Sequence, residues 1–250
     1  MCIFDDGMYK KMPLDRLSTL FRQAHFSIAN PPPNLSAPML VLSEAQSGHI
    51  EIRYQRSAQN SNNDPLAIFI DFGGEQSALF QAIPDAIRMN LNPQHAAWAV
   101  AQTVLTELQT PRCGGPIMLE RLVEVLMIYL LRDAIEFGAQ QTGMLLGLAD
   151  PQLKHALVAV HDSPDHPWTV DELAHQSGVS RTVFYKRFNE KVGCSPSHYL
   201  RQWRLTLARS QLLKGHRISQ VAKSIGYQSN EGFSRAFHQH FGEWPSEVGE

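Results

Sequence analysis

Side chains that could contact a nucleic acid gather on one face of the segment from Arg181 to Val192. That face carries Arg181, Thr182, Tyr185, Lys186 and Arg187. Cationic and hydroxyl groups donate hydrogen bonds to phosphate oxygens and to base edges in the major groove. Ser180 and Arg181 would lie at the N-terminus of this helix, where the backbone N–H groups and the helix dipole favour a phosphate. The alternative interpretation is an ordinary solvated helix face.

Two short helices joined by a tight turn are predicted to position these side chains. Thr169 followed by Glu172 has the spacing of a capping box, in which hydroxyl and carboxylate each satisfy a backbone N–H group. Gly178 can leave the first helix with positive φ. The second helix is expected to bury Val183, Phe184, Phe188 and Val192. Many helical hairpins share this pattern, but it is typical of a helix-turn-helix whose second helix enters the major groove.

The same pattern occurs a second time further along the chain. Leu173, Ala174, Gly178, Phe184, Phe188, Gly193 and Pro196 recur as Val221, Ala222, Gly226, Phe233, Phe237, Gly242 and Pro245. The spacing between the copies grows by one residue within the turn, where an insertion is easiest to absorb. A long helix over residues 197–213 is predicted between them, and about 17 residues at 1.5 Å each give roughly 25–26 Å. The two second helices could then lie about one DNA turn, roughly 34 Å, apart on one face of a duplex.

Charge is distributed unevenly along the chain. The whole chain has 22 Lys and Arg against 24 Asp and Glu, for a net charge of −2. Residues 1–150 are acidic on balance, whereas residues 168–240 carry a clear excess of Lys and Arg. A basic segment that also holds paired helix-turn-helix patterns is expected at a surface that contacts phosphates. We therefore predict double-stranded DNA as a partner of this segment.

Two stretches, LAHQSGVSRTVFYKRFNEKVGCSP and IGYQSNEGFSRAFHQHFG, carry a family resemblance. They are similar to the DNA-binding domain of AraC/XylS-type transcription regulators, and the similarity covers about residues 151–250. The resemblance implies that Thr182, Tyr185 and Lys186 read bases in the first copy, and Asn230, Glu231, Ser234 and Arg235 in the second. Lys and Arg suit guanine, and Asn suits adenine. One departure is Gly232, where a helix former such as Ala is more usual; glycine should weaken this helix by up to about 1 kcal/mol.

The N-terminal part is predicted to contain strands and then helices. Residues 39–54 and 66–72 have the apolar runs and alternation of strands, and residues 96–108 and 116–137 have helical periodicity. The segments Leu79–Ile87 and Cys113–Asp133 are similar to AraC-type regulators with a cupin-like sensor, although the chain between Phe26 and Phe72 is short for a complete barrel. The expected fold class is α+β. We expect a shortened cupin-like domain over 1–95, a helical subdomain over 96–137, a linker over 138–150 and an all-α double helix-turn-helix domain over 151–250.

The helix predicted over residues 116–137 has two interpretations. Its apolar positions recur at helical steps, namely Leu119, Leu122, Val123, Leu126, Tyr129 and Leu130. The helix could pack on its own domain. Because Val125, Ile128 and Leu131 widen the apolar surface, it could also form the seam of a homodimer.

The signal sensed by the N-terminal part is expected to be an organic molecule or the oxidation of Cys2 or Cys113. The candidate lining is apolar and aromatic, with a few polar groups: Phe26, Ile28, Leu40, Leu42, Ile52, Tyr54, Ile68, Ile70 and Phe72, together with His49, Arg53 and Asp71. Such residues suit a small, partly apolar molecule, or they fill a core that holds no ligand. His25, His49 and His95 are too isolated in sequence to suggest a metal site. We expect no metal and no cofactor.

An enzymatic role is the less favoured alternative. AraC-like domains also occur fused to DNA-alkylation repair modules that use a nucleophilic cysteine. Cys113 lies just before a predicted helix N-terminus, where a thiolate is favoured. No histidine lies near it in sequence, so we do not expect catalysis, and we expect Cys194 to be structural.

The expected function is sequence-specific transcription regulation that reads two adjacent major-groove segments. We expect an activator with RNA polymerase as a partner and with an effector-sensing N-terminal domain. Cysteines few in number and far apart indicate a reducing compartment. We expect neither a secretory signal nor a membrane-spanning helix, because no apolar stretch is long enough to span a lipid bilayer. We expect a cytoplasmic protein without a membrane partner.

Overall fold

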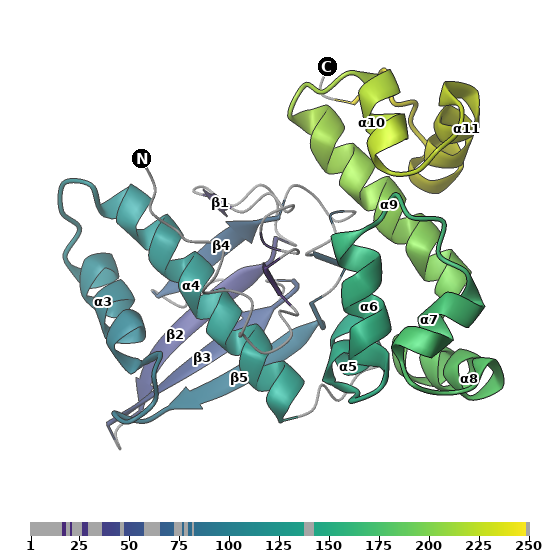
Figure 1. Ribbon diagram of the computed structural model, residues 1–250. Coiled ribbons are helices and arrows are strands. Elements are labelled where there is room, and N and C mark those ends of the chain that lie inside the picture. The colour runs from purple at the N-terminus through teal and green to yellow at the C-terminus, as the bar shows by residue number, and fades with distance from the viewer. Residues whose placement is uncertain are drawn as a thin grey trace, which may run out of the picture.

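The computed structural model describes residues 17–18, 21, 27–29, 37–45, 48–57, 66–72, 77, 80–81, 83–137 and 143–248. Within them a β-sheet precedes a series of helices (Figure 1). The strands are β1 (Ser27–Ala29), β2 (Met39–Ala45), β3 (His49–Gln55), β4 (Ala67–Asp71) and β5 (Ala86–Leu91). The helices are α3 (Trp98–Gln109), α4 (Gly115–Glu136), α5 (Met144–Ala149), α6 (Leu153–Asp162), α7 (Val170–Gln176), α8 (Arg181–Val192), α9 (Pro196–Leu213), α10 (Ile218–Ser224) and α11 (Asn230–Phe241). The expected α+β class is confirmed.

The sheet is antiparallel throughout, with the strand order β1-β4-β2-β3-β5. Side chains alternate across it, so that Ile50, Ile52 and Tyr54 of β3 are buried while their neighbours are more exposed. Helix α4 crosses the sheet (Figure 1) and contacts β1 and β5. The strands predicted over residues 39–54 and 66–72 are confirmed as β2, β3 and β4.

Strand β5 is an element that the sequence interpretation missed. Its residues alternate strictly, with Ile87, Met89 and Leu91 buried and the residues between them exposed. Arg, Met and Asn are not typical strand formers, and the strand lies between Pro84 and Pro93, so the local composition did not indicate it. Full pairing with β3 decides the conformation instead.

Helix α4 packs on its own domain, which confirms the first of its two interpretations. Its buried side chains are Val123, Leu126, Met127, Leu130, Leu131 and Ile135. Leu131, which we had assigned to a wider apolar surface, therefore belongs to the core of the chain itself. Val125 is 38% exposed and Ile117 is 72% exposed, so part of the apolar surface stays outside.

The segment expected to be a linker contains a packed helix. Met144, Leu145 and Leu148 of α5 are buried, and α5 contacts α4, α6 and α8. Apolar residues in this short run pack between the N-terminal part and the C-terminal helices. Residues 138–142 of the expected linker lie outside the described residues.

Helix α9 separates two helical pairs, α7 with α8 and α10 with α11 (Figure 1). Its side chains predicted to be buried are buried: Tyr199, Leu200, Trp203, Leu207 and Leu212. At 1.5 Å per residue its 18 residues extend about 27 Å. A rigid helix of this length fixes the distance between the two pairs.

Candidate nucleic-acid interface

The first helix-turn-helix begins at the predicted capping box. The hydroxyl of Thr169 accepts a hydrogen bond from the backbone N–H of Glu172 at 3.2 Å, and the Glu172 carboxylate accepts one from the Thr169 N–H at 2.8 Å. The hydrogen bond from the Thr169 N–H, followed by that from its hydroxyl, lowers the pKa of Glu172. Gly178 leaves α7 with a φ of 66°. The Ser180 hydroxyl then caps α8 by accepting from the N–H of Val183.

The buried face of α8 differs from the prediction at one position. Phe184, Phe188 and Val192 are buried as expected, but Val183 is 49% exposed. Residues 184, 188 and 192 form one i, i+4 row that faces the core, and position 183 lies beside that row. Val183 therefore belongs to the exposed face of α8, with Lys186.

The second helix-turn-helix repeats the glycine turn and the serine cap of its second helix, although α10 begins at Arg217 without a side-chain cap. Gly226 forms the turn with a φ of 83°, and Gly242 ends α11 with a φ of 77°. The Ser229 hydroxyl caps α11 by accepting from the N–H of Gly232 at 3.1 Å. Phe233 and Phe237 are fully buried. The two copies seen in the sequence are therefore two structural units of the same kind.

The nine side chains that we expected to contact DNA fall into two groups, one on each second helix. Ser180 caps α8, and Arg181, Thr182, Tyr185 and Lys186 are exposed along it. Asn230, Glu231 and Arg235 are exposed on α11, and Ser234 is half-buried. The structure thus places each set on one helix, and α9 holds the two sets apart.

Two of these cations have weak partners. The Arg181 guanidinium lies 2.9 Å from the Asp171 carboxylate, and the Lys186 ammonium lies 3.9 Å from that of Glu190. All four side chains are mostly exposed. Exposed ion pairs contribute about 0–1 kcal/mol, so both cations can exchange these carboxylates for a phosphate or a base.

Arg187 has a different role from its neighbours on α8. Its guanidinium donates to the buried Asp150 carboxylate at 2.7 Å. The same carboxylate accepts from the backbone N–H groups of Gln152 and Leu153, at the start of α6. Burial alone would raise the pKa of Asp150, but the hydrogen bonds from Arg187, Leu153 and Gln152 together hold it below its usual value. Arg187 therefore fixes α8 to α5 and α6, a link that its position on the basic face did not predict.

Arg204 joins the two helix-turn-helix units. Its guanidinium donates to the carbonyl of Pro164 at 2.5 Å and to that of His166 at 2.8 Å, in the loop between α6 and α7. Gly226 of the second unit packs against the same loop, because a Cβ there would lie 2.5 Å from the carbonyl oxygen of Asp165. The loop that leads into α7 thus contacts α9 and the turn of the second unit, which fixes the units relative to each other.

Replacing Gly226 by alanine should therefore destabilise the C-terminal part. The Cβ would meet backbone atoms, and the residue would keep a positive φ. We expect a loss of about 2–4 kcal/mol in the free energy of unfolding, measured by urea denaturation. Gly215→Ala is the control, since Gly215 also has a positive φ, of 81°, but no atom of the described residues lies within 4 Å of its Cβ position. This substitution should cost only about 1 kcal/mol. Equal losses would contradict the contact with the Asp165 loop.

Most of the apolar residues of the expected effector lining belong to the core of the sheet, whereas His49 is exposed and Ile28, Arg53 and Asp71 are half-buried. Leu40, Leu42, Ile52, Tyr54, Ile68, Ile70 and Phe72 are at most 4% exposed and pack in one cluster. Cys113 is exposed, next to Gly114 at the start of α4, and Cys194 is half-buried. Cys2, His25 and Phe26 lie outside the described residues. Within the described ranges, no three His, Cys, Asp or Glu side chains cluster as a metal site would require, and no helix is long and apolar enough to cross a membrane.

Two capped units with exposed polar second helices define a double helix-turn-helix domain. The family described as a helix-turn-helix domain matches residues 173–250, and the family described as cupin matches residues 20–136. An AraC-like transcription regulator of Streptomyces antibioticus is 34% identical over 177 residues, which cover 69% of this chain and 58% of that protein. The transcriptional regulator AlkR of Acinetobacter baylyi is 35% identical over 175 residues, covering 68% of this chain and 57% of that one. The chain thus spans less than three fifths of the length of these relatives.

Solved structures with a similar C-terminal part are also known. An AraC-type transcriptional regulator of Chromobacterium violaceum is 30% identical, with a TM-score of 0.38, and the match covers 40% of this chain and 89% of that one. The family matches and the relatives together identify the chain. It belongs to the AraC-type helix-turn-helix regulators and carries a cupin-family N-terminal domain.

Proposed function

We propose that this chain is a sequence-specific, DNA-binding transcription regulator in which α8 and α11 read two adjacent major-groove segments. The observation that carries the proposal is the pair of exposed polar faces on α8 and α11, held apart by the single helix α9. Its relatives are named transcription regulators, which supports the same conclusion. Selection of bound duplexes from a random pool tests it. Enrichment of one consensus with two conserved blocks is expected, and enrichment without any consensus would refute it.

Each helix offers side chains for both phosphate and base contacts. Lys186 and Arg235 are suited to the O6 and N7 acceptors of guanine, and Asn230 to adenine. Thr182, Tyr185, Glu231 and Ser234 complete the base-facing set. Ser180 and Arg181 lie at the start of α8, where phosphate binding is favoured. We add Val183, because an exposed apolar side chain on this face can contact the methyl group of thymine.

The N-terminal domain is proposed to control this binding through α5. That helix contacts α4 on one side and α8 on the other. The backbone N–H of Gly143 donates to the carbonyl of Lys191 at 2.9 Å, and Asp150 binds Arg187. A change in the N-terminal domain would therefore reach α8 directly. Activation by contact with RNA polymerase is part of the proposal. Transcription in vitro from a template with the selected site, with and without the protein, would show whether the protein activates or represses.

A homodimer formed through the outer face of α4 is also proposed. Ile117 and Val125 are exposed there, beside the exposed Arg121 and Arg132. Large apolar side chains exposed on one helix face are typical of a protein interface, and a two-fold axis would pair the helix with its own copy.

Replacing Val125 by aspartate should split this dimer without unfolding the domain. The two new carboxylates, one from each copy, would lie in an apolar interface and should raise the dimer Kd at least about tenfold. The control Gln102→Asp, at an exposed position of α3, should leave the Kd unchanged. Leu126, which is fully buried, would be a poor choice, because aspartate there would disrupt the core. Sedimentation of each variant at micromolar concentration makes the comparison. Wild-type protein that sediments as a monomer would refute the dimer.

A further inference from the structure

A hollow of about 460 Å³ lies where the N-terminal domain, α5 and both helix-turn-helix units meet. Its wall includes Gln81, Met144, Cys194, Trp203, Thr206 and His240. These residues come from the sheet domain, α5, the end of the first unit, α9 and α11. A volume of this size suits a small organic molecule.

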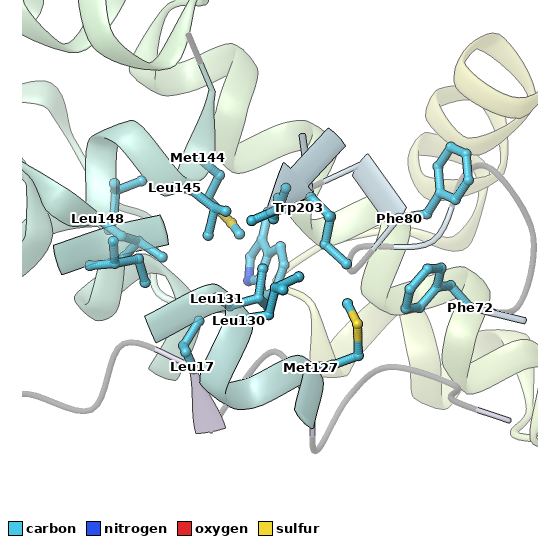
Figure 2. Close-up of a cluster of buried hydrophobic side chains, with 14 of the residues drawn as sticks. Leu17, Phe72, Phe80, Met127, Leu130, Leu131, Met144, Leu145, Leu148 and Trp203 are labelled. Carbon is cyan, nitrogen blue, oxygen red and sulfur yellow. The ribbon is translucent and has the colours of Figure 1, made fainter. Parts of the chain in front are cut away.

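One side of this hollow, which we call the junction pocket, is a rigid set of rings. The hydroxyl of Tyr199 is 2.7 Å from Nε2 of the buried His161. The His161 ring packs against Trp203 at a tilt of 34°, with a centroid distance of 4.2 Å. Figure 2 shows the Trp203 indole beside Met144 and Leu131, which come from α5 and α4. The ring therefore inserts from α9 into the junction with the N-terminal domain.

The lining of the junction pocket selects an uncharged molecule. Its apolar part includes Met144, Val192 and Trp203, and among the described residues no Asp, Glu, Lys or Arg lines it. An ionised group would lose its hydration there without gaining an opposite charge. Burial lowers the pKa of His240, as do the nearby His198 and Arg201, which favours its neutral imidazole. The amides of Gln81 and Gln202 and this imidazole offer hydrogen bonds to a carbonyl or hydroxyl group.

We propose that the junction pocket binds a neutral, mostly apolar small molecule with a carbonyl or hydroxyl group, and that its occupancy controls DNA binding. A ligand there touches Met144, Cys194 and His240 together, and so fixes the orientation of both helix-turn-helix units relative to the N-terminal domain. The regulatory half of this inference rests on the proposed function, whereas the binding half does not.

The neutral fluorophore 6-propionyl-2-(dimethylamino)naphthalene, which carries a carbonyl group, is the probe for the binding half, used with the full chain carrying Cys2→Ser. We expect one saturable site by fluorescence. Since Cys194 lines the pocket and Cys113 is exposed elsewhere, saturating probe should slow alkylation of Cys194 by iodoacetamide at least about fivefold, with Cys113 unchanged in the same sample. Absence of saturable binding, or binding that does not slow the alkylation of Cys194, would refute the proposal that the junction pocket is a ligand site.

A large side chain placed inside the junction pocket should block the probe, and the same substitution at an exposed position outside it is the matched control. Thr206→Phe should abolish probe binding, whereas Thr103→Phe should not. Both hydroxyls donate to the carbonyl four residues earlier, at 2.9 and 2.7 Å, but Thr103 is exposed on α3. If Thr206→Phe does not fold, Gln202→Trp at the half-buried rim replaces it. Probe binding retained by the folded, filled variant overturns the assignment.

Control of DNA binding by the pocket is tested by measuring the Kd for the selected duplex with and without the probe. Saturating probe should change the Kd for DNA about fivefold or more in the wild type and leave it unchanged in the filled variant. Probe that protects Cys194 without changing the Kd overturns control by this pocket. A chain that binds probe but no duplex instead refutes the proposed function and leaves the binding site standing.

Discussion

Replacing both Lys186 and Arg235 by alanine should abolish specific DNA binding under conditions in which the wild type binds tightly. Each cation is expected to contribute about 1–3 kcal/mol through base contacts. The two side chains lie on different helices of different units, so their effects should add. The double variant should then bind about 30-fold to 20,000-fold more weakly.

The single variants carry the more specific expectation. Lys186→Ala should relax base preference in one half of the site and Arg235→Ala in the other, as measured by gel shifts with a series of base-substituted duplexes. Arg88→Ala is the control, because Arg88 is an exposed cation on β5, outside the helix-turn-helix units. If both variants kept the affinity and base preference of the wild type, α8 and α11 would not be the helices that read the DNA.

The second large effect is a loss of stability in mild acid that depends on His161. Burial lowers the pKa of His161 to about 3, so the folded chain keeps this ring neutral. The unfolded chain takes up the proton near pH 6.5. Because only the unfolded state binds that proton between these values, the free energy of unfolding is highest above pH 6.5 and falls as the pH falls. The loss should reach about 2–3 kcal/mol by pH 4.5.

Urea denaturation between pH 7 and pH 4.5 measures this dependence. His161→Gln keeps a group that can bond the Tyr199 hydroxyl but removes the titration, so its stability should fall less steeply with pH. His155→Gln, at an exposed position on the same helix, should follow the wild type. Equal slopes in all three proteins would show that His161 does not remain neutral in the folded chain.

The features that sequence predicted well are local ones. A capping box needs only Thr169 and Glu172, and the rows Phe184–Phe188 and Phe233–Phe237 follow from helical periodicity alone. The family resemblance assigned the expected DNA-facing side chains to two helices, and the structure contains these helices as α8 and α11; contact of these side chains with DNA stays a prediction. Position 183 was assigned to the wrong face because periodicity does not fix the edge of an apolar stripe.

The features that sequence did not predict depend on contacts between distant segments. Strand β5 is stabilised by pairing with β3 rather than by its own composition. Asp150 and Arg187 are far apart in sequence, and each residue considered alone would be expected to be a solvated charge on the surface. The junction pocket is formed by several separate segments, so no single stretch of sequence could indicate it.

Footprinting on the selected duplex tests the central claim most directly. Methylation interference should identify two blocks of major-groove contacts on one face of the DNA, with centres about 10 base pairs apart. In the Lys186→Ala protein the interference should weaken in one block only, and in the Arg235→Ala protein in the other. A single block of contacts, or two variants that weaken the same block, would contradict the account.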